Sequence, residues 1–252
     1  MRTAVLLVLM LALPARAVDK PDLEALKKQG AQALLEALDK RHNDYPTQKW
    51  TFKMVLKSAS GDTREMTFST WQKNKTKRLT RFLEPGEVKG MSVLIAPGDA
   101  MYVYSPQTDN VRRVALSARR QTFMGSDLTF DDMSQVDFAV DYDATLDKED
   151  GKALWLDLKR KAGREIQWEH LRLKVDKEWA LIETIEYYDG GKHVKTQQRG
   201  NPAMDGKIPH YKLITVTDLA SKHKTELHML TQVIGDDIPD SVFSKRSLVR
   251  GN

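Results

Sequence analysis

The sequence predicts a mostly β protein of about ten strands, built as one antiparallel sheet that curves over a core. Apolar and polar residues alternate over most of the chain from residue 48 onward, which is the period of a strand with one buried face. Turn residues such as Gly61–Asp62 and Asp189–Gly190–Gly191 separate these stretches by short intervals, as in antiparallel hairpins. No internal repeat and no low-complexity linker divides the chain. We therefore expect a single domain.

The first residues have the features of a signal peptide. Met1–Arg2 gives a basic start, residues 3–13 form an apolar run, and Ala15–Arg16–Ala17 is a small-x-small cleavage site. The apolar run is shorter than the roughly 20 residues that a spanning helix needs, so no stable membrane anchor is expected. No cysteine follows the cleavage site, which argues against a lipid-anchored product. We expect cleavage after Ala17 and a periplasmic domain over residues 18–252.

The composition is that of a globular chain without disulfide bonds. Hydrophobic residues make up 40% of the chain and charged residues 30%, and there is no cysteine, so stability must come from an ordinary core. The net charge of +5 falls to +3 when the two arginines of the signal peptide are removed. A balance this mildly basic suits contact with anionic lipid head groups, but it does not indicate nucleic acid as a partner.

The mature chain is expected to open with one amphipathic helix over residues 21–41. Leu23, Leu26, Leu34 and Leu38 recur there at helical spacing, and charged side chains occupy the other faces. Such a helix packs its apolar side on a sheet.

The period changes to two at residue 48. Trp50, Phe52, Met54 and Leu56 then share one strongly apolar face of a strand. The sequence returns through Met66 and Phe68, which continue that face after the turn. Further strands are expected in this half over 76–83, 88–95, 101–105 and 111–116.

The middle of the chain, residues 137–151, is acidic and has few strongly apolar side chains. Two alternatives are a solvated connection and a calcium site. The aspartate spacing fits no EF-hand loop, so the connection is favoured. Beyond it, residues 192–199 are polar and suit an edge strand. The other strands are expected over 153–159, 165–175, 181–188, 211–219 and 224–233, followed by a short capped helix over 239–243.

The stretch from Met101 to Met133 is the most informative part of the chain. A strand carrying Tyr102 and Tyr104 is broken at Pro106, and a return strand carries Arg112 and Arg113. The loop that follows is expected to expose Phe123 and Met124, which a soluble surface would not favour. Ser126 or Asp127 is expected to cap a short helix, on which Asp131 and Asp132 are interpreted as surface groups. The inner side of that helix would carry Leu128, Phe130 and Met133.

This stretch resembles the outer-membrane lipoprotein-sorting protein family, a branch of the LolA/LolB-like superfamily of periplasmic carriers. The residues that carry the resemblance are Tyr102–Tyr104–Pro106, Val111–Arg112–Arg113, Phe123–Met124–Gly125–Ser126–Asp127 leading into Asp131–Asp132–Met133, and Glu84–Pro85 through Lys89–Gly90 upstream. They span about one-fifth of the chain. The resemblance implies an incomplete antiparallel β-barrel, with the N-terminal helix and short loop helices as a lid, that holds acyl chains.

The expected ligand site follows from this resemblance and from the apolar faces. A lid over residues 123–133 is expected to swing because its own contacts would be few. Methionine is prominent among the candidates, and its flexible thioether adapts to ligands of variable shape. Arg112 and Arg113 are candidates for head-group or partner contacts. The candidate cavity and lid residues are Trp50, Phe52, Met54, Leu56, Met66, Phe68, Met91, Tyr102, Tyr104, Phe123, Met124 and Leu128.

No catalytic constellation is apparent, so neither an enzyme, a metal nor a cofactor is expected. Thiol chemistry is excluded because the chain has no cysteine. Ser126 lies in Met-Gly-Ser-Asp and lacks the second glycine of a nucleophile elbow. His223 and His228 fall on opposite faces of a strand, so they cannot jointly bind one metal from that strand.

The favoured function is a periplasmic carrier that shields the acyl chains of a lipoprotein or free lipid for transfer toward the outer membrane. Each CH₂ group removed from water contributes about 0.8 kcal/mol, so such chains need an apolar cover. The candidate partners are an inner-membrane transporter and an outer-membrane acceptor. The alternatives are a lipid-sensing adaptor with the same fold, working with a membrane partner, and a lipid hydrolase, which the lack of a nucleophile argues against.

Overall fold

The computed structural model describes residues 19–98, 100–206 and 208–250, and the expected signal peptide lies outside this part of the chain. Within these residues the strands form one antiparallel sheet in the order β6-β5-β4-β3-β2-β1-β13-β12-β11-β10-β9-β8-β7. The strands are β1 (Thr47–Lys57), β2 (Thr63–Lys73), β3 (Lys77–Glu84), β4 (Ser92–Ala96), β5 (Ala100–Ser105), β6 (Asn110–Arg113), β7 (Tyr142–Glu149), β8 (Ala153–Arg160), β9 (His170–Asp176), β10 (Leu181–Asp189), β11 (Lys192–Asp205), β12 (Ile208–Asp218) and β13 (Lys224–Ile234).

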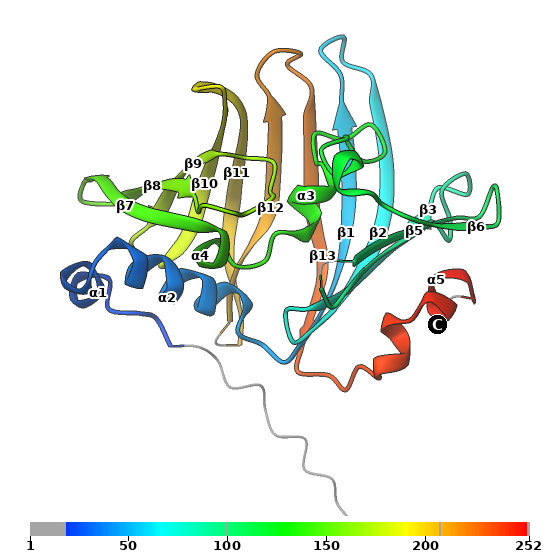
Figure 1. The fold of residues 1–252 in the computed structure, drawn as a ribbon, viewed down its shortest axis with the longest axis horizontal. Helices are drawn as coiled ribbons and strands as arrows, with labels where there is room; N and C mark the ends of the chain where they lie inside the picture. The colour runs from blue at the N-terminus through cyan, green and yellow to red at the C-terminus, as the bar shows by residue number, and fades with distance from the viewer. Residues whose placement is uncertain (1–18, 99, 207, 251–252) are drawn as a thin grey trace, which may run out of the picture.

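The sheet is strongly curved but not closed, as predicted for an incomplete barrel (Figure 1). The first strand, β1, pairs with the last strand, β13, so two meanders join at the centre of the sheet and end at the edge strands β6 and β7. The described residues form thirteen strands, more than the ten or so expected.

One reason for the higher number is β7, whose acidic sequence favoured a solvated connection. Residues 138–149 instead form helix α4 (Phe138–Asp141) and strand β7, whose side chains are mostly exposed. Only the start of β7 is buried, and an edge strand that is exposed over most of its length needs no apolar alternation, so its pattern carried no strand signal. The opposite error occurred for residues 192–199. They belong to β11, which pairs on both sides with β10 and β12 and is therefore not an edge strand.

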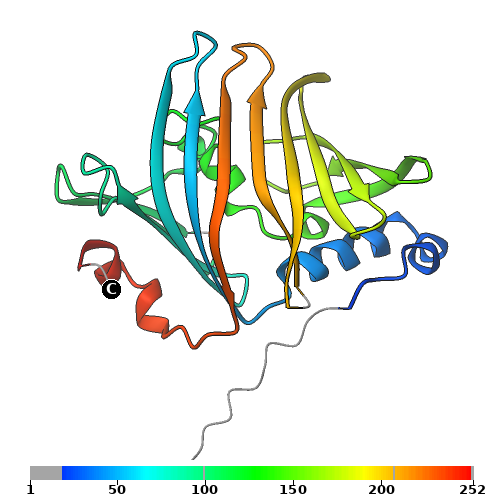
Figure 2. The same ribbon diagram turned by 180° about the vertical axis from the view of Figure 1, so that it is seen from behind.

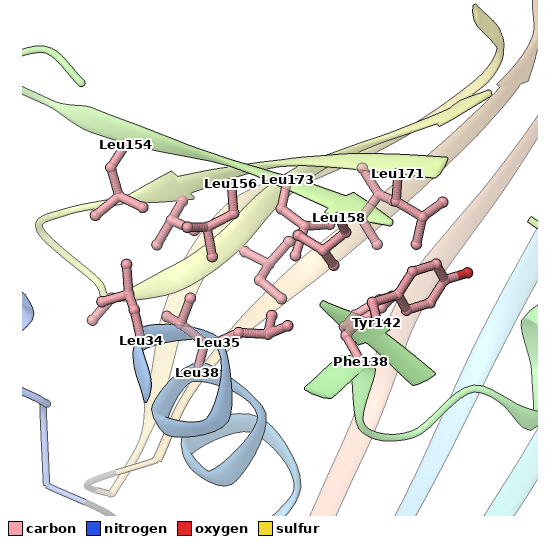
Figure 3. Close-up of a cluster of buried hydrophobic side chains, with 14 of the residues drawn as sticks. Leu34, Leu35, Leu38, Phe138, Tyr142, Leu154, Leu156, Leu158, Leu171 and Leu173 are labelled. Carbon is pink, nitrogen blue, oxygen red and sulfur yellow. The ribbon is translucent and has the colours of Figure 1, made fainter. Parts of the chain in front are cut away.

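The N-terminal helix is also divided, into α1 (Leu23–Gln29) and α2 (Ala31–Asn43). Gly30 separates them with φ of 118°, a conformation that side chains with a Cβ rarely adopt. Leu34, Leu35 and Leu38 of α2 pack under the second half of the sheet, against leucines of β8 and β9 (Figure 3). The helix therefore covers one end of the curved sheet.

The C-terminal residues form a 3₁₀ helix, η2 (Asp240–Phe243), as expected, and a further helix, α5 (Lys245–Arg250). Phe243 and Leu248 pack against Leu79, Leu94 and Tyr104 of β3, β4 and β5. Neighbouring residues on these strands belong to a different apolar cluster, so the C-terminal helices lie on the face of the sheet opposite to it.

The loop between β6 and β7 crosses the concave face of the sheet. It contains a 3₁₀ helix, η1 (Leu116–Ala118), and helix α3 (Phe130–Ser134), and we call residues 123–134 the cover segment. In the two views α3 lies on one side of the long central strands, in front in Figure 1 and behind in Figure 2. In the described part of the chain, no helix combines the length and the apolar character that crossing a membrane requires.

Candidate functional site

A cavity of about 1480 Å³ lies between the concave face of the sheet and the helices and loops that cover it. Typical small-ligand pockets measure about 300–1,000 Å³, so this cavity can hold a larger molecule. Its walls come from β1, β2 and β3 on one side and β10 to β13 on the other, with the end of α2, η1 and the cover segment above them.

One end of the cavity is aromatic. Phe52, Phe68 and Phe82 lie side by side on β1, β2 and β3, with ring centroids 5.6 and 5.4 Å apart. Phe123 and Phe130 of the cover segment continue the series, at 5.6 Å from Phe82 and 5.1 Å from each other. The cover segment is therefore joined to the sheet by an unbroken row of aromatic contacts.

The same three strands become polar toward the other end of the cavity. The register places Gln48, Gln72 and Arg78 in one row across β1, β2 and β3, and Thr70 and Thr80 in the next, where their hydroxyl oxygens lie 2.9 Å apart. The next row along the strands is that of Phe52, Phe68 and Phe82, so the cavity wall changes from polar to apolar along the strands. A ligand with one polar and one apolar end matches this change.

Three nitrogen-bearing side chains enter the cavity from distant parts of the chain. His42 comes from the end of α2, Arg78 from β3 and Arg199 from β11. His42 is accessible from the cavity, and its pKa is lowered by partial removal from bulk water and by the two positive arginines. Burial also lowers the pKa of Arg78 to about 10, which leaves it charged near neutral pH.

The cover segment is held by a buried ion pair. Lys195 Nζ of β11 lies 2.5 Å from Asp132 Oδ2 of α3, and both side chains are almost completely buried. Trp168 Nε1 donates to the other oxygen of Asp132 at 2.9 Å, and Thr129 caps α3 through a reciprocal hydrogen bond with Asp132. The interpretation of Asp132 as a surface group is wrong, because it is the charged centre of this contact.

A second anchor holds the start of the cover segment. Asp127 Oδ2 accepts from Thr225 Oγ1 at 2.7 Å and lies 2.8 Å from His223 Nδ1, and Asp127 N donates to Thr225 Oγ1. Phe123 is only 3% exposed, contrary to the expectation that it would be exposed. The N-cap is Thr129, not Ser126 or Asp127. The expectation that this segment makes few contacts is therefore also wrong.

The structure brings about half of the predicted ligand residues to the cavity wall. Leu56 and Met66 are buried in the same apolar cluster as the wall but do not reach the cavity, and Met91 and Met124 pack against that cluster. Of the two arginines, Arg113 lines the cavity and Arg112 does not. The predicted residues that line it are Trp50, Phe52, Met54, Phe68, Phe123 and Leu128.

Tyr102 and Tyr104 lie on the opposite face of the sheet. Met101 and Val103 of β5 belong to the cluster beneath the cover segment, so the alternating tyrosines face the C-terminal helices. Both sets of side chains in this strand are apolar or aromatic, and the sequence could not show which set would face the cavity.

Arg78 and Arg199 were missed. Arg78 points to the same face of β3 as the apolar Phe82, four residues further along the strand. Arg199 lies on β11, a central strand that was interpreted as an edge strand. A charged residue at an inward-facing strand position was the available signal for Arg78. For Arg199 the signal depended on knowing that β11 has neighbours on both sides.

The described residues contain no group of three or more His, Asp or Glu side chains placed to hold a metal ion. The Ser126 hydroxyl donates to the carbonyl oxygen of Phe123 at 2.6 Å. The chemistry that the cavity offers is thus that of an apolar container with a polar, positively charged end.

The fold is shared with solved structures of the LolA type. A domain from Vibrio parahaemolyticus named "putative outer membrane lipoprotein-sorting protein domain" matches with a TM-score of 0.77 and 22% identity over 88% of this chain and 99% of that one. A DUF1329 family protein from Desulfovibrio piger gives 0.79 and 22% over 88% and 98%. A LolA superfamily protein from Nitrosomonas europaea gives 0.72 and 19% over 86% and 98%. The search of curated proteins found no match.

The chain thus has a LolA-like fold, an open curved sheet covered by short helices, and the predicted resemblance is confirmed at the level of the fold. A family model with the description "-like: Uncharacterized protein" matches residues 74–250, and the chain belongs to that family. The matched residues include the cover segment and all strands from β3 to β13.

Proposed function

We propose that this protein is a periplasmic carrier that shields acyl chains of a lipoprotein or lipid during transfer toward the outer membrane. The observation that carries the proposal is the covered cavity of about 1480 Å³ on the concave face of the sheet. Its aromatic end supplies apolar surface, and burial of apolar surface contributes about 25 cal/mol per Å². The LolA-like fold of the chain supports the same class of function.

The mouth of the cavity has exposed apolar and basic side chains that suit a membrane surface. Leu116 of η1 is 55% exposed and Val140 of α4 is 57% exposed, and both line the cavity. Arg112 and Arg113 of β6 are exposed next to η1. We propose that these groups contact lipid head groups, or a transporter and an acceptor, when cargo enters and leaves.

Release requires the cover segment to move. Because Asp127 and Asp132 tie it to β13 and β11, we propose that it opens as a unit when both anchors break. Cargo then passes to a partner or membrane of higher affinity, and this chain needs no energy source of its own. The proposed site of action is the periplasm, reached through the signal peptide expected over residues 1–17.

The test is uptake and delivery of lipid by the delipidated mature chain, residues 18–252. A fluorescent fatty acid reports binding, and acceptor vesicles of phosphatidylethanolamine and phosphatidylglycerol report transfer. A carrier binds the probe and delivers it to the vesicles. Binding without delivery would favour the sensing alternative, and absence of binding would overturn the carrier proposal.

Two adjacent residues of β13 provide a matched pair of variants. Met229 lines the cavity, whereas Leu230 is 55% exposed and does not line it. Met229→Asp places a charge on the apolar wall and is expected to weaken probe binding at least tenfold, about 1.4 kcal/mol. Leu230→Asp adds the same charge to the same strand and is expected to leave binding unchanged. Equal effects of the two variants would mean that the probe does not bind in this cavity.

A further inference from the structure

The polar end of the cavity holds two positive charges that lack an acidic partner. Arg78 Nε and Nη2 donate to Gln72 Oε1 at 3.1 and 2.6 Å, and Nη1 donates to the carbonyl oxygen of Met133. Arg199 Nη1 lies 3.5 Å from the carbonyl oxygen of Ile182. The Gln197 amide, with its oxygen turned toward Arg199, accepts from Nε and Nη2 at 3.0 Å each. No carboxylate of the described residues lies within 4.0 Å of either guanidinium.

Three of the acidic groups that line the cavity have cationic partners, and neither Asp131 nor Glu165, which also line it, lies within 4.0 Å of Arg78 or Arg199. Asp132 pairs with Lys195, Asp137 with Lys75 at 3.0 Å, and Asp141 with Arg164. Asp39 acts on Arg199 only at longer range, and its carboxylate accepts from the backbone amide of Ala139 at 2.7 Å. Both arginine side chains are half-buried, and a partly desolvated charge without a counter-charge is costly, so the two arginines are available to an anionic ligand.

Unused hydrogen-bonding groups surround these arginines. Gln48 Nε2, Gln72 Nε2 and Tyr211 Oη are buried and have no hydrogen-bond partner in the described structure. Gln48 and Gln72 lie in the same cross-strand row as Arg78, and Tyr211 lines the cavity and interacts with Arg199. The two amide nitrogens are donors and the hydroxyl can donate, so the site offers charge and hydrogen bonds to an acceptor-rich ligand.

We propose that the polar end of the cavity binds the anionic group of an amphiphile, a carboxylate or phosphate, between Arg78 and Arg199. This inference rests on the proposed carrier function and specifies its cargo class. Guanidinium groups match both anions in geometry, and such charge-assisted hydrogen bonds are about twice as strong as neutral ones. The acyl chain then runs along the row of Phe52, Phe68 and Phe82. The preferred cargo is an anionic lipid rather than a neutral acyl group.

The experiment compares three probes on the delipidated mature chain by calorimetry: palmitate, hexadecanol and inorganic phosphate. Palmitate and hexadecanol share a chain length and differ in charge. The protein is expected to bind palmitate at least tenfold more tightly than hexadecanol. Equal affinity for the two would overturn the anion site and leave the carrier function standing. Failure to bind either would overturn the carrier function itself.

Arg199→Gln is the decisive variant, because the hydrogen bonds of Arg199 go to Ile182 and Gln197, whereas Arg78 also bonds Met133 of the cover segment. It is expected to weaken palmitate binding about tenfold or more and to leave hexadecanol binding unchanged, which also shows that the cavity is still folded. Arg78→Gln is expected to act in the same direction. The control is Arg246→Gln, which removes an exposed arginine of α5 outside the cavity and is expected to change neither affinity. A loss that is equal for both probes would overturn the proposal.

Two further measurements identify the source of the anion. In the first, dioleoyl phosphatidic acid competes with palmitate. If it displaces palmitate from wild-type protein and Arg199→Gln weakens its binding as well, the site also accepts phospholipid head groups. Failure of phosphatidic acid to compete would restrict the proposal to carboxylates. Inorganic phosphate is expected to compete only weakly because it lacks an acyl chain. Competition by phosphate at the same concentration as palmitate would show a free-anion site and overturn the proposal of an amphiphile.

Discussion

Lys195 and Asp132 form a buried ion pair that joins the central strand β11 to helix α3, with 2.5 Å between Nζ and Oδ2. Lys195 Nζ also lies 4.5 Å from the ring centroid of Trp168 and 4.3 Å from that of Tyr187. The pair therefore fixes the cover segment over the cavity through a charged contact and two aromatic faces. It is one of two polar anchors of the cover segment, the other being the contacts of Asp127 with Thr225 and His223.

Lys195→Met is expected to destabilise this contact strongly. It leaves Asp132 buried without its counter-charge, and breaking a buried pair from one side costs about 3–5 kcal/mol. We expect faster hydrogen exchange in residues 123–134 and a lower free energy of unfolding in urea. The control is Lys53→Met, which removes an exposed pair with Glu65 and should cost less than about 1 kcal/mol. Similar effects of the two variants would contradict the anchoring role of Lys195.

Phe123→Ala tests the aromatic contact between the cover segment and the sheet. Phe123 is 3% exposed and its ring lies between those of Phe82 and Phe130. Removal of a buried phenylalanine typically costs about 3–5 kcal/mol, so the unfolding midpoint in urea should fall clearly. Met124→Ala removes a neighbouring side chain that is only partly buried and should cost less. A larger loss for Met124 would mean that the segment packs differently.

The pattern of the sequence predicted those parts of the fold and site that local periodicity determines. In β1, Trp50, Phe52 and Met54 form the only strongly apolar face, so the alternation alone placed them on the cavity wall. Tyr102 and Tyr104 could not be placed in the same way because both faces of their strand are apolar. The number of strands suggested a curved sheet, whereas its openness followed from the family resemblance and not from periodicity.

Features that depend on contacts between distant segments were not predictable. The burial of Phe123 depends on Phe82, 41 positions away in sequence, and the burial of Asp132 depends on Lys195 in a later strand. The charged end of the cavity needs His42, Arg78 and Arg199 to meet, and no local pattern links them. Strand β7 was missed for the opposite reason, because an exposed edge imposes no pattern at all.

Asp39 is expected to make stability depend on pH. Burial raises the pKa of Asp39 to about 7, well above its ordinary value of 3.8. Between these values the folded state holds more protons than the unfolded state, so the free energy of unfolding should fall as the pH rises from 4 to 7. The full effect is on the order of 4 kcal/mol. In Asp39→Asn, which keeps an acceptor for the Ala139 amide, this fall should be largely absent, as measured by urea unfolding at several pH values.

The opposite result for Asp39 would also be informative. The free energy of unfolding of the wild-type protein could instead change between pH 4 and 7 in the same way as that of Asp39→Asn. The Asp39 carboxyl group would then ionise at its ordinary pKa in the folded state. Asp39 would then be open to water, and the packing of α2 against α4 that buries it would be wrong.

His42 gives a direct spectroscopic report on the charged end of the cavity. Partial removal from bulk water and the charges of Arg199 and Arg78 lower its pKa below the ordinary 6.5. In the empty protein the imidazole should therefore take up its proton below pH 6.5, and an NMR titration of its ring shifts measures this. The unfolded state takes up this proton near pH 6.5, so His42 lowers the stability of the fold progressively below that pH.

A bound carboxylate offsets the positive charge of the two arginines, so saturation with palmitate should raise the pKa of His42 in wild-type protein. Arg199→Gln removes one of the positive charges and should raise that pKa even without ligand. An imidazole that titrates near 6.5 in the empty wild-type protein would show that neither arginine acts on it and that this end of the cavity is open to bulk water.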